Sequence, residues 1–339
     1  MSMKLYIEKC LEAHDLTVDE AASALELIMT NQATEAQIAG LLIALRAKGE
    51  AVDELVGFAR TMRGKSLRIN VEDENALDIV GTGGDGLGTF NISTLASIVA
   101  AGAGVTVAKH GNRSVSSRSG SADLLRALGV NIELPPERVE RCINSTGIGF
   151  LFAPLFHPAM KYAAKPRVEL GVKTIFNMVG PLTNPAGAAR QVIGAYNPKV
   201  ASHLASALVQ LKTKRACVVH GSGGMDEVAL SGETSVFEVT EAGGREEYSL
   251  RPSDFGLPTY PLSSILGGST EENAGITYSI LNGEHGAPRD VVVANAALGI
   301  YVSGRAPSLP ECRALAEESI DSGNALGTLK TLVEVTNQV

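Results

Sequence analysis

The residues best suited to chemistry lie in and beside a stretch without carboxylates. Between Asp85 and Asp123 the chain has no acidic residue, although its formal charge is −8. The region contains the runs GTGGDG at 81–86, FNIST at 90–94 and KHGNRSVSSRSGS at 109–121. Backbone N–H groups, hydroxyls and cations without a competing anion favour binding of a polyanion, phosphate above all.

The glycine run matches two known phosphate-binding patterns only in part. Gly81, Gly83 and Gly86 have the dinucleotide spacing, but the acid expected about twenty residues later is absent. The P-loop pattern fails because Leu87 stands where lysine is required. Two interpretations remain: a turn whose N–H groups approach an anion, or a tight turn followed by a helix N-cap.

Adjacent carboxylates, Asp226 and Glu227, follow the run HGSGGM at 220–225. Carboxylates at a strand end beside a phosphate site suit Mg²⁺, which combines a few carboxylates with water and phosphate oxygens. The alternative is a solvated surface pair. The run 109–121 has two interpretations as well: a loop that closes over phosphate oxygens, or a solvated surface loop.

Composition is that of an ordinary soluble protein. The 339 residues, 45% hydrophobic and 19% charged, suffice for two domains. The net charge argues against a general nucleic-acid or membrane-surface binder. The four cysteines form no CxxC pair, and there is no N-terminal apolar signal core. We therefore expect a cytoplasmic enzyme without nucleic-acid or membrane partners.

Helical patterns dominate residues 1–72. The segments 17–20 and 34–37 fit capping boxes, and Gly49 and Gly64 favour helix C-caps. Beyond them, strands and helices alternate, which predicts an α/β domain. Strands are predicted at 76–80, 105–109, 216–220 and 234–239, and helices at 95–101, 122–128 and 200–211.

Seven motifs in sequence order resemble the anthranilate phosphoribosyltransferase family. They are GTGGDG at 81–86, FNIST at 90–94, KHGNRSVSS at 109–117, GSAD at 120–123, HPAM at 157–160, TIFNMVGPLTNP at 174–185 and GGMDE at 223–227. The resemblance covers nearly the whole chain, to about residue 330. It implies an α/β fold with a small helical domain plus a large α/β domain, whose central mixed β-sheet is flanked by helices.

The resemblance also implies domain limits and an assembly. The helical domain would comprise 1–72, completed by helices at about 157–193. The α/β domain, 73–156 and 194–339, would bind phosphoribosyl pyrophosphate and metal. A homodimer through the helical domain is expected.

Site residues follow from the resemblance in three groups. Those implied for phosphoribosyl pyrophosphate are Gly81, Gly84, Asp85, Thr89, Asn91, Ile92, Ser93, Thr94, Lys109, His110, Gly111, Asn112, Arg113, Ser114, Val115, Ser116, Ser117 and Ser121. Those implied for anthranilate are Gly81, His110, Asn112, Arg167 and Pro181. Ser93, Asp226 and Glu227 would hold two Mg²⁺ ions per subunit. The context of Arg167 is slightly variant, since many relatives have Val-Arg-Arg there.

The expected reaction transfers the phosphoribosyl group of 5-phosphoribosyl 1-pyrophosphate to the amino group of anthranilate. The products are N-(5-phosphoribosyl)anthranilate and pyrophosphate, in the second step from chorismate to tryptophan. An arylamine is already nucleophilic at pH 7, and the sequence shows no nucleophile–base pair of the triad kind. We expect no covalent enzyme intermediate and assign no catalytic acid or base.

Two alternatives remain open. A pyrimidine-nucleoside phosphorylase would share the fold, but such enzymes carry a different lysine/serine phosphate motif and lack GPLTNP. A non-catalytic nucleic-acid-binding relative disagrees with the net charge and with the presence of Asp226, Glu227 and Asn112.

Overall fold

The computed structural model describes residues 2–113 and 119–338. The N-terminal half contains α1 (Met3–Leu11), α2 (Val18–Met29), α3 (Glu35–Lys48), α4 (Val52–Lys65), β1 (Leu77–Gly81), α5 (Ile92–Gly102), β2 (Val107–Gly111), α6 (Ser121–Ala127), α7 (Pro136–Thr146), β3 (Ile148–Phe152), α8 (Ala153–Phe156) and α9 (Lys161–Leu170). The remainder contains α10 (Ile175–Val179), η2 (Gly180–Leu182), β4 (Arg190–Gly194), α11 (Pro198–Gln210), β5 (Arg215–Gly221), β6 (Thr234–Val239), β7 (Arg245–Leu250), α12 (Thr270–Leu281), α13 (Ala287–Ser303), α14 (Leu309–Asp321) and α15 (Asn324–Asn337).

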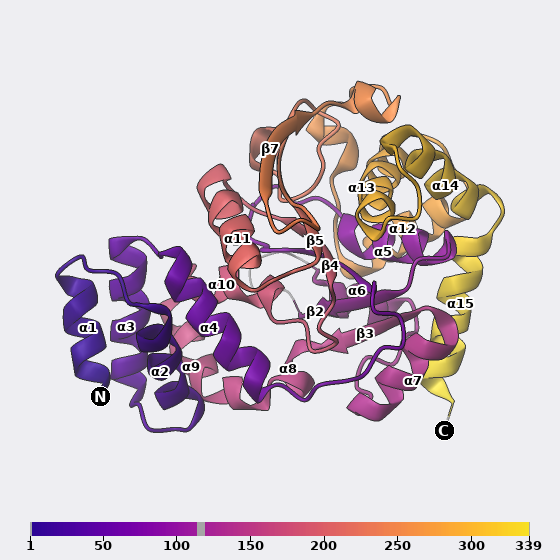
Figure 1. Cartoon of the computed structure of the whole chain (residues 1–339). Helices are drawn as coiled ribbons and strands as arrows, with labels where there is room; N and C mark the ends of the chain where they lie inside the picture. The colour runs from indigo at the N-terminus through magenta and orange to yellow at the C-terminus, as the bar shows by residue number, and fades with distance from the viewer. Residues whose placement is uncertain (1, 114–118, 339) are drawn as a thin grey trace.

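A seven-stranded mixed sheet forms the centre of the large domain, in the order β3-β2-β1-β4-β5-β6-β7 (Figure 1). The strands from β3 to β5 in this order pair in parallel, whereas β6 and β7 are antiparallel. The chain builds outward from β1 to β3 on one side and then returns to β4 on the other. Ligands of open α/β sheets bind at such a reversal, beside the carboxyl ends of the strands. Here Gly81 of β1 pairs with Gly194 of β4 at those ends.

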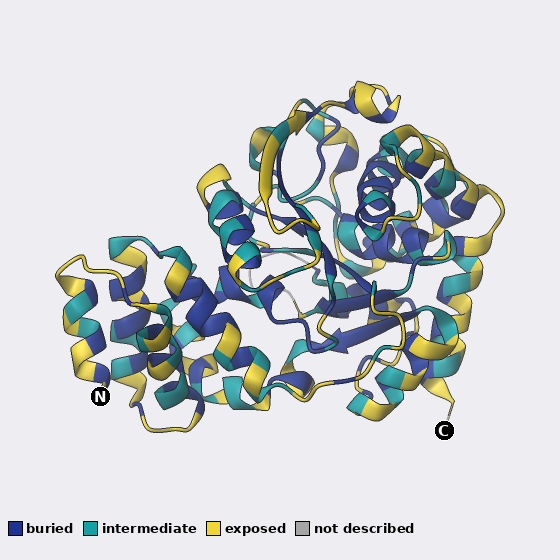
Figure 2. Cartoon of the chain, in the orientation of Figure 1, coloured by how far each residue is buried: buried dark blue, intermediate teal, exposed yellow. Residues whose placement is uncertain are grey.

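Helices cover both faces of this sheet. The central strands are buried, while exposed residues collect on the outer helices and loops (Figure 2). Leu77 and Ile79 pack in the core that contains α5 and α13, whereas Ile193 and Val218 pack in the core that contains α11. Burial on both faces explains why β3 and the centre of β5 lack the polar alternation of a half-exposed strand. None of the described helices is long and apolar enough to cross a membrane.

The small helical domain gathers α1 to α4 with α9 and α10 (Figure 1). Phe58 of α4 and Phe176 of α10 contribute neighbouring rings, with centroids 5.8 Å apart. A small helical domain beside a large α/β domain confirms the predicted fold class. The exact domain limits stay a prediction, with one correction: residues 190–193 belong to β4, because they pair with β1 and β5.

Local sequence signals decide most helix ends. Both predicted capping boxes are present, at the N-termini of α2 and α3. Gly49 ends α3 with a φ of 91°, a backbone conformation that favours glycine. The prediction for Gly64 was wrong, because α4 continues to Lys65, whose ammonium group pairs with Glu26 at 2.6 Å.

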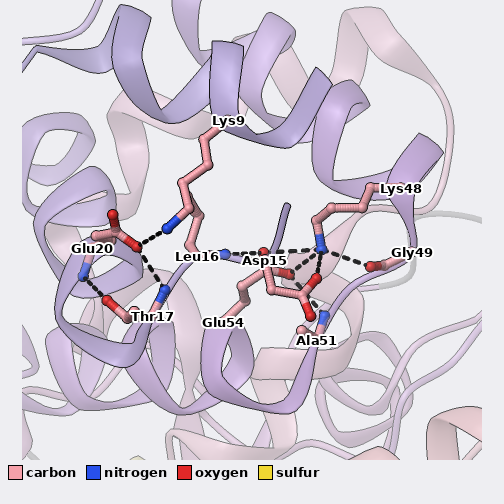
Figure 3. Close-up of polar contacts among 9 residues, drawn as sticks. All are labelled: Lys9, Asp15, Leu16, Thr17, Glu20, Lys48, Gly49, Ala51 and Glu54. Atoms are coloured by element: carbon pink, nitrogen blue, oxygen red, sulfur yellow. Dashed lines mark hydrogen bonds and ion pairs between the residues drawn. The ribbon is translucent and has the colours of Figure 1, made fainter. Parts of the chain in front are cut away.

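Figure 3 shows a buried carboxylate that connects separate segments of the helical domain through hydrogen bonds and an ion pair. The carboxylate of Glu54 is fully buried and accepts hydrogen bonds from the backbone N–H of Leu16 at 2.9 Å and of Ala51 at 2.7 Å. The Lys48 ammonium, with a side chain only 4% exposed, lies 3.1 Å from the same carboxylate. Lys48 also contacts Asp15, whose side chain is 65% exposed.

Replacing Glu54 with Leu is expected to destabilise the protein by about 3–5 kcal/mol, because the variant leaves two buried N–H groups without an acceptor and removes the buried carboxylate beside Lys48. Urea unfolding would measure the change. Asp15→Asn is the matched control, since an exposed partner of the same lysine contributes at most about 1 kcal/mol. Equal losses in the two variants would contradict a special role for the buried carboxylate.

Candidate active site

The glycine turn, residues 81–86, follows the carboxyl end of β1 and lies beneath the loop that carries Asp226. The N–H of Thr82 donates to the Gly194 carbonyl at 2.9 Å. A Cβ at Gly194 would lie 1.5 Å from the Asp226 carbonyl oxygen, and one at Gly81 would lie 2.7 Å from its Oδ2. Glycine at both strand ends therefore allows the Asp226 loop to close over the reversal point of the sheet.

Three carboxylates converge on this point. The N–H of Gly83 donates to Asp226 Oδ2 at 2.8 Å. Burial and the nearby Asp85 raise the pKa of Asp226 to about 7, and burial together with Asp226 raises the pKa of Glu227 well above its usual range. Asp85 Oδ2 is buried without a hydrogen-bond partner among the described residues. Such crowding of carboxylates favours a bound cation.

Lys109 supplies only part of the missing positive charge. Its side chain is buried, and Nζ donates to the Ile79 carbonyl at 2.6 Å. Its charge offsets part of the rise in the pKa of Glu227, as does a hydrogen bond from the backbone of Ser93. No group of three His, Cys, Asp or Glu residues forms a complete metal cage in the described parts of the chain. The arrangement fits Mg²⁺, which takes one or two carboxylates and completes its shell with water and phosphate.

Two hydrogen bonds connect the start of α5 to neighbouring segments. Asn91 accepts a hydrogen bond from Asn273 of α12 at 3.1 Å and donates to the Ser119 carbonyl at 3.0 Å. Thr94 Oγ1 is buried and makes no hydrogen bond within the described residues. The Ile92 side chain lies in the hydrophobic core, so only its backbone could face a ligand.

Neighbouring segments hold the glycine turn from outside. Lys173, between α9 and α10, donates from Nζ to the Gly84 carbonyl, and its ammonium lies 3.8 Å from the Tyr196 ring centroid. Thr89 forms an antiparallel bridge with Leu266. Sequence reasoning missed Lys173, although its position just before the motif TIFN was a signal.

A buried polar cluster fixes the end of β2 to the GPLTNP segment. Asp78 accepts from the His110 N–H at 3.1 Å and from Asn184 Nδ2 at 2.9 Å. Asn184 Nδ2 also donates to the Ala108 carbonyl at 2.8 Å. Burial raises the pKa of Asp78 to about 6. Asp78 and Asn184 were missed, although a lone carboxylate within an apolar strand indicates a polar partner.

The basic loop is described only at its ends. A Cβ at Gly111 would lie 2.8 Å from the Phe150 ring, so the chain passes close to β3. The Arg113 guanidinium lies 5.5 Å from the Phe152 ring centroid and 3.3 Å from Glu133, and the backbone N–H of Arg113 donates to Asn112 Oδ1. Ser121 begins α6. The predicted ligands Ser114, Val115, Ser116 and Ser117 lie outside the described residues.

Arg167 is placed on α9 as a half-buried cation. Its guanidinium lies 4.9 Å from the Phe176 ring centroid, and burial lowers its pKa. Its side chain forms no ion pair or hydrogen bond within residues 2–113 and 119–338, and Glu169 pairs instead with Lys165 at 3.9 Å. The Pro181 carbonyl accepts from Gln191 Nε2 at 2.9 Å. No hydrogen bond between described residues joins Arg167 to Asn112 or His110.

His110 and His157 form a buried pair, with ring centroids 5.3 Å apart. Burial lowers the pKa of both, to about 3 for His110, where His157 and Lys109 also contribute, and to about 4 for His157. Both rings are therefore neutral at pH 7. As the pH falls below about 6.5, the unfolded chain binds protons that the folded chain does not, so stability decreases.

Replacing His157 with Gln is expected to remove part of this acid sensitivity. Between pH 7 and pH 5 the wild type should lose up to about 2 kcal/mol more unfolding free energy than the variant, because one buried histidine no longer titrates. Urea unfolding at both pH values measures the difference. Exposed His14 provides the control variant His14→Gln, which should follow the wild type. Parallel pH profiles for all three proteins would refute the prediction.

Comparison with known proteins agrees with this architecture. The profile of the glycosyl transferase family, helical bundle domain, matches residues 4–66, and that of the glycosyl transferase family, a/b domain, matches residues 73–326. The chain is thus an enzyme of the glycosyltransferase class. The anthranilate phosphoribosyltransferase of Pelotomaculum thermopropionicum is 52% identical over 337 residues, which cover 99% of this chain and 97% of the relative.

Solved structures give the same result. The anthranilate phosphoribosyltransferase of Thermus thermophilus is 46% identical and superposes with a TM-score of 0.92, covering 98% of this chain and 99% of its own. The Saccharomyces cerevisiae enzyme has been solved with phosphoribosyl pyrophosphate and Mg (30% identity, TM-score 0.91) and with 4-fluoroanthranilate (29%, 0.89); each comparison covers 99% of this chain and 98% of the yeast chain. The chain belongs to the anthranilate phosphoribosyltransferase family.

Proposed function

We propose that this chain transfers the phosphoribosyl group of 5-phosphoribosyl 1-pyrophosphate to the amino group of anthranilate. The observation that carries the proposal is the glycine turn at the reversal point of the sheet, covered by Asp226 and flanked by Asp85 and Glu227. A donor with a pyrophosphate leaving group needs backbone donors and a cation site together. The family's enzymes carry this activity in their name.

The donor would bind along the glycine turn and the first turn of α5. Backbone N–H groups and the positive end of the helix favour phosphate there. The remaining predicted ligands, from Lys109 to Ser121, would close over it. Lys109 would act through its charge on Glu227 and not by direct contact with the donor, because its ammonium group already donates a hydrogen bond to the Ile79 carbonyl.

Asp226, Glu227 and Ser93 are the residues that would hold Mg²⁺, two ions per subunit. Bound Mg²⁺ supplies charge neutralisation for a pyrophosphate leaving group. The raised carboxyl pKa values support this assignment, since burial and the neighbouring carboxylates both disfavour the ionised forms, and a bound cation would offset both effects.

Anthranilate would bind near Arg167, Asn112, His110 and Pro181. Arg167 offers a planar guanidinium without a carboxylate partner in the described chain, which suits the carboxylate of the acceptor. The neutral rings of His110 and His157 add no further charge to this side.

Transfer would proceed in one displacement. The amine nitrogen bonds to the anomeric carbon as the bond from that carbon to the pyrophosphate oxygen breaks, and the nitrogen then loses one proton. The sugar has oxocarbenium character in the transition state. No strong base is required, so positioning and leaving-group stabilisation carry the rate and no covalent enzyme intermediate forms. The reaction would be the second step of tryptophan biosynthesis from chorismate, in the cytoplasm.

A homodimer through the helical domain completes the proposal. Exposed apolar side chains on α1, α3 and α9 support it; they are Leu5, Leu11, Ile43 and Val168, with exposures of 51%, 70%, 41% and 76%. α1 packs on α3 and α3 packs on α9, so these side chains lie on neighbouring helices, where exposed apolar surface favours contact with a partner. Light scattering should give twice the mass of one chain, and Val168→Asp should shift it toward the monomer. A monomeric wild type would rule the assembly out.

Calorimetric titration with phosphoribosyl pyrophosphate, with and without Mg²⁺, tests the donor. Chromatographic detection of N-(5-phosphoribosyl)anthranilate tests the reaction. Donor binding that needs Mg²⁺, followed by product formation, is the expected outcome. Cleavage of a pyrimidine nucleoside with phosphate, without donor binding, would instead assign a nucleoside phosphorylase.

A further inference from the structure

A second basic site lies outside the candidate active site, between the carboxyl ends of α4 and α11. A surface cavity of about 320 Å³ is lined by Arg60, Arg63, Gly64, Arg68, Gln210, Leu211 and Lys212. Four of these seven residues are cationic and none is acidic, in a chain whose net charge is −8. The volume lies at the lower end of the range of small-molecule sites.

The cations of this cavity lack anionic partners. Arg60, Arg63, Arg68 and Lys212 form no ion pair within the described residues. The carboxylate of Asp53 accepts a hydrogen bond from the lining residue Gln210, through Nε2, at 3.0 Å and pairs with none of these four cations. A cation in the last turn of α4 could simply stabilise the negative end of the helix dipole. That explanation does not cover Arg60, which lies before this turn, or Arg68, which lies after it.

Arg63 adds an independent indication of a ligand. Its Nε donates to the Leu182 carbonyl at 2.6 Å, and this is the one hydrogen bond that its side chain donates within the described residues. A guanidinium has five N–H donors, so four remain for another acceptor. Burial, and to a lesser extent the adjacent positive charge of Arg68, lowers the pKa of Arg63 to about 10.

We propose that this cavity binds a small multivalent oxyanion, a pyrophosphate group or a phosphate ester. Guanidinium groups match phosphate oxygens with paired hydrogen bonds, and three arginines with one lysine can neutralise two or more charges. The site is distinct from the glycine turn, since its lining residues come from α4, the segment that follows it, and the end of α11.

Calorimetry in magnesium-free buffer, at constant ionic strength, tests the proposal with pyrophosphate, inorganic phosphate and ribose 5-phosphate as separate probes. The cavity variant is Arg60→Gln/Arg68→Gln/Lys212→Gln, which keeps Arg63 because that residue holds Leu182. The control, Lys4→Gln/Arg141→Gln/Lys330→Gln, removes the same charge from exposed positions on α1, α7 and α15. All three proteins retain the glycine turn, so a difference between them reports on the cavity.

We expect the wild type and the control to bind at least one probe about tenfold more tightly than the cavity variant, or with one additional site per chain. The probe with the largest difference distinguishes a free inorganic anion from a phosphorylated metabolite. Equal binding of every probe by the three proteins overturns the proposal. Binding of polyglutamate alone would overturn it as well and assign the cavity to an acidic protein segment.

Discussion

Replacing Asp226 with Asn and Glu227 with Gln is expected to lower the transfer rate about a hundredfold, the equivalent of about 3 kcal/mol in the transition state. The two carboxylates lie over the reversal point of the sheet, where Gly83 donates to Asp226. Without their charge the leaving pyrophosphate loses its stabilisation. Steady-state rates at saturating substrates and Mg²⁺ provide the measurement.

Thermal unfolding of the same double variant separates function from folding. Burial and Asp85 disfavour the ionised form of Asp226, so neutral amides should leave the metal-free protein at least as stable as the wild type above pH 7. Glu246→Gln/Glu247→Gln, on exposed β7, is the matched control and should keep full activity. A rate within a few-fold of wild type in the Asp226 and Glu227 double variant would remove the metal assignment.

Replacing Arg167 with Ala is expected to weaken the use of anthranilate by about 2–3 kcal/mol, the magnitude of a charge-assisted hydrogen-bonded pair. The guanidinium lies against Phe176 without an anion among the described residues, so it is available to a substrate carboxylate. The apparent affinity for phosphoribosyl pyrophosphate should stay near wild type, because that ligand is expected on the glycine turn. Kinetics with each substrate varied separately measure both effects.

Two further variants sharpen this test. Arg167→Lys should restore activity only in part, since lysine keeps the charge but loses the planar fork. Lys165→Ala, on the same helix, removes an exposed cation paired with Glu35 and should change neither substrate constant. An equal loss for both substrates in Arg167→Ala would mean that the residue supports the fold and does not contact the acceptor.

Much of the fold could be predicted because its signals are local. The capping boxes at Thr17 and Thr34 depend on residues three positions apart, and strand β6 was predicted with its observed limits, Thr234–Val239. Gly64 was predicted to end a helix, but α4 continues past it to Lys65. Glycine permits a helix end but does not require one, and the pairing of Lys65 with Glu26 lies far beyond the local sequence.

The sequence predicts a set of site residues but not their arrangement. An acid-free stretch and ordered motifs predict which side chains would contact phosphate. They did not indicate that Asp226 bonds Gly83, 143 positions away, or that Asn184 fastens Asp78. These contacts depend on the parallel register of β1 with β4. The sequence of the intervening chain does not specify that register.

The sequence by itself determined the fold class, the family and the acid-free character of residues 86–122, because composition, periodicity and motifs reside in neighbouring residues. Only the tertiary structure decided which charges meet. It placed three carboxylates beside one lysine, left Arg167 without an anion among the described residues, and brought four cations from α4 and α11 and their flanking segments around one cavity. Burial of apolar surface drives folding without specifying partners, so charge pairing emerges only when the packed elements fix the distances.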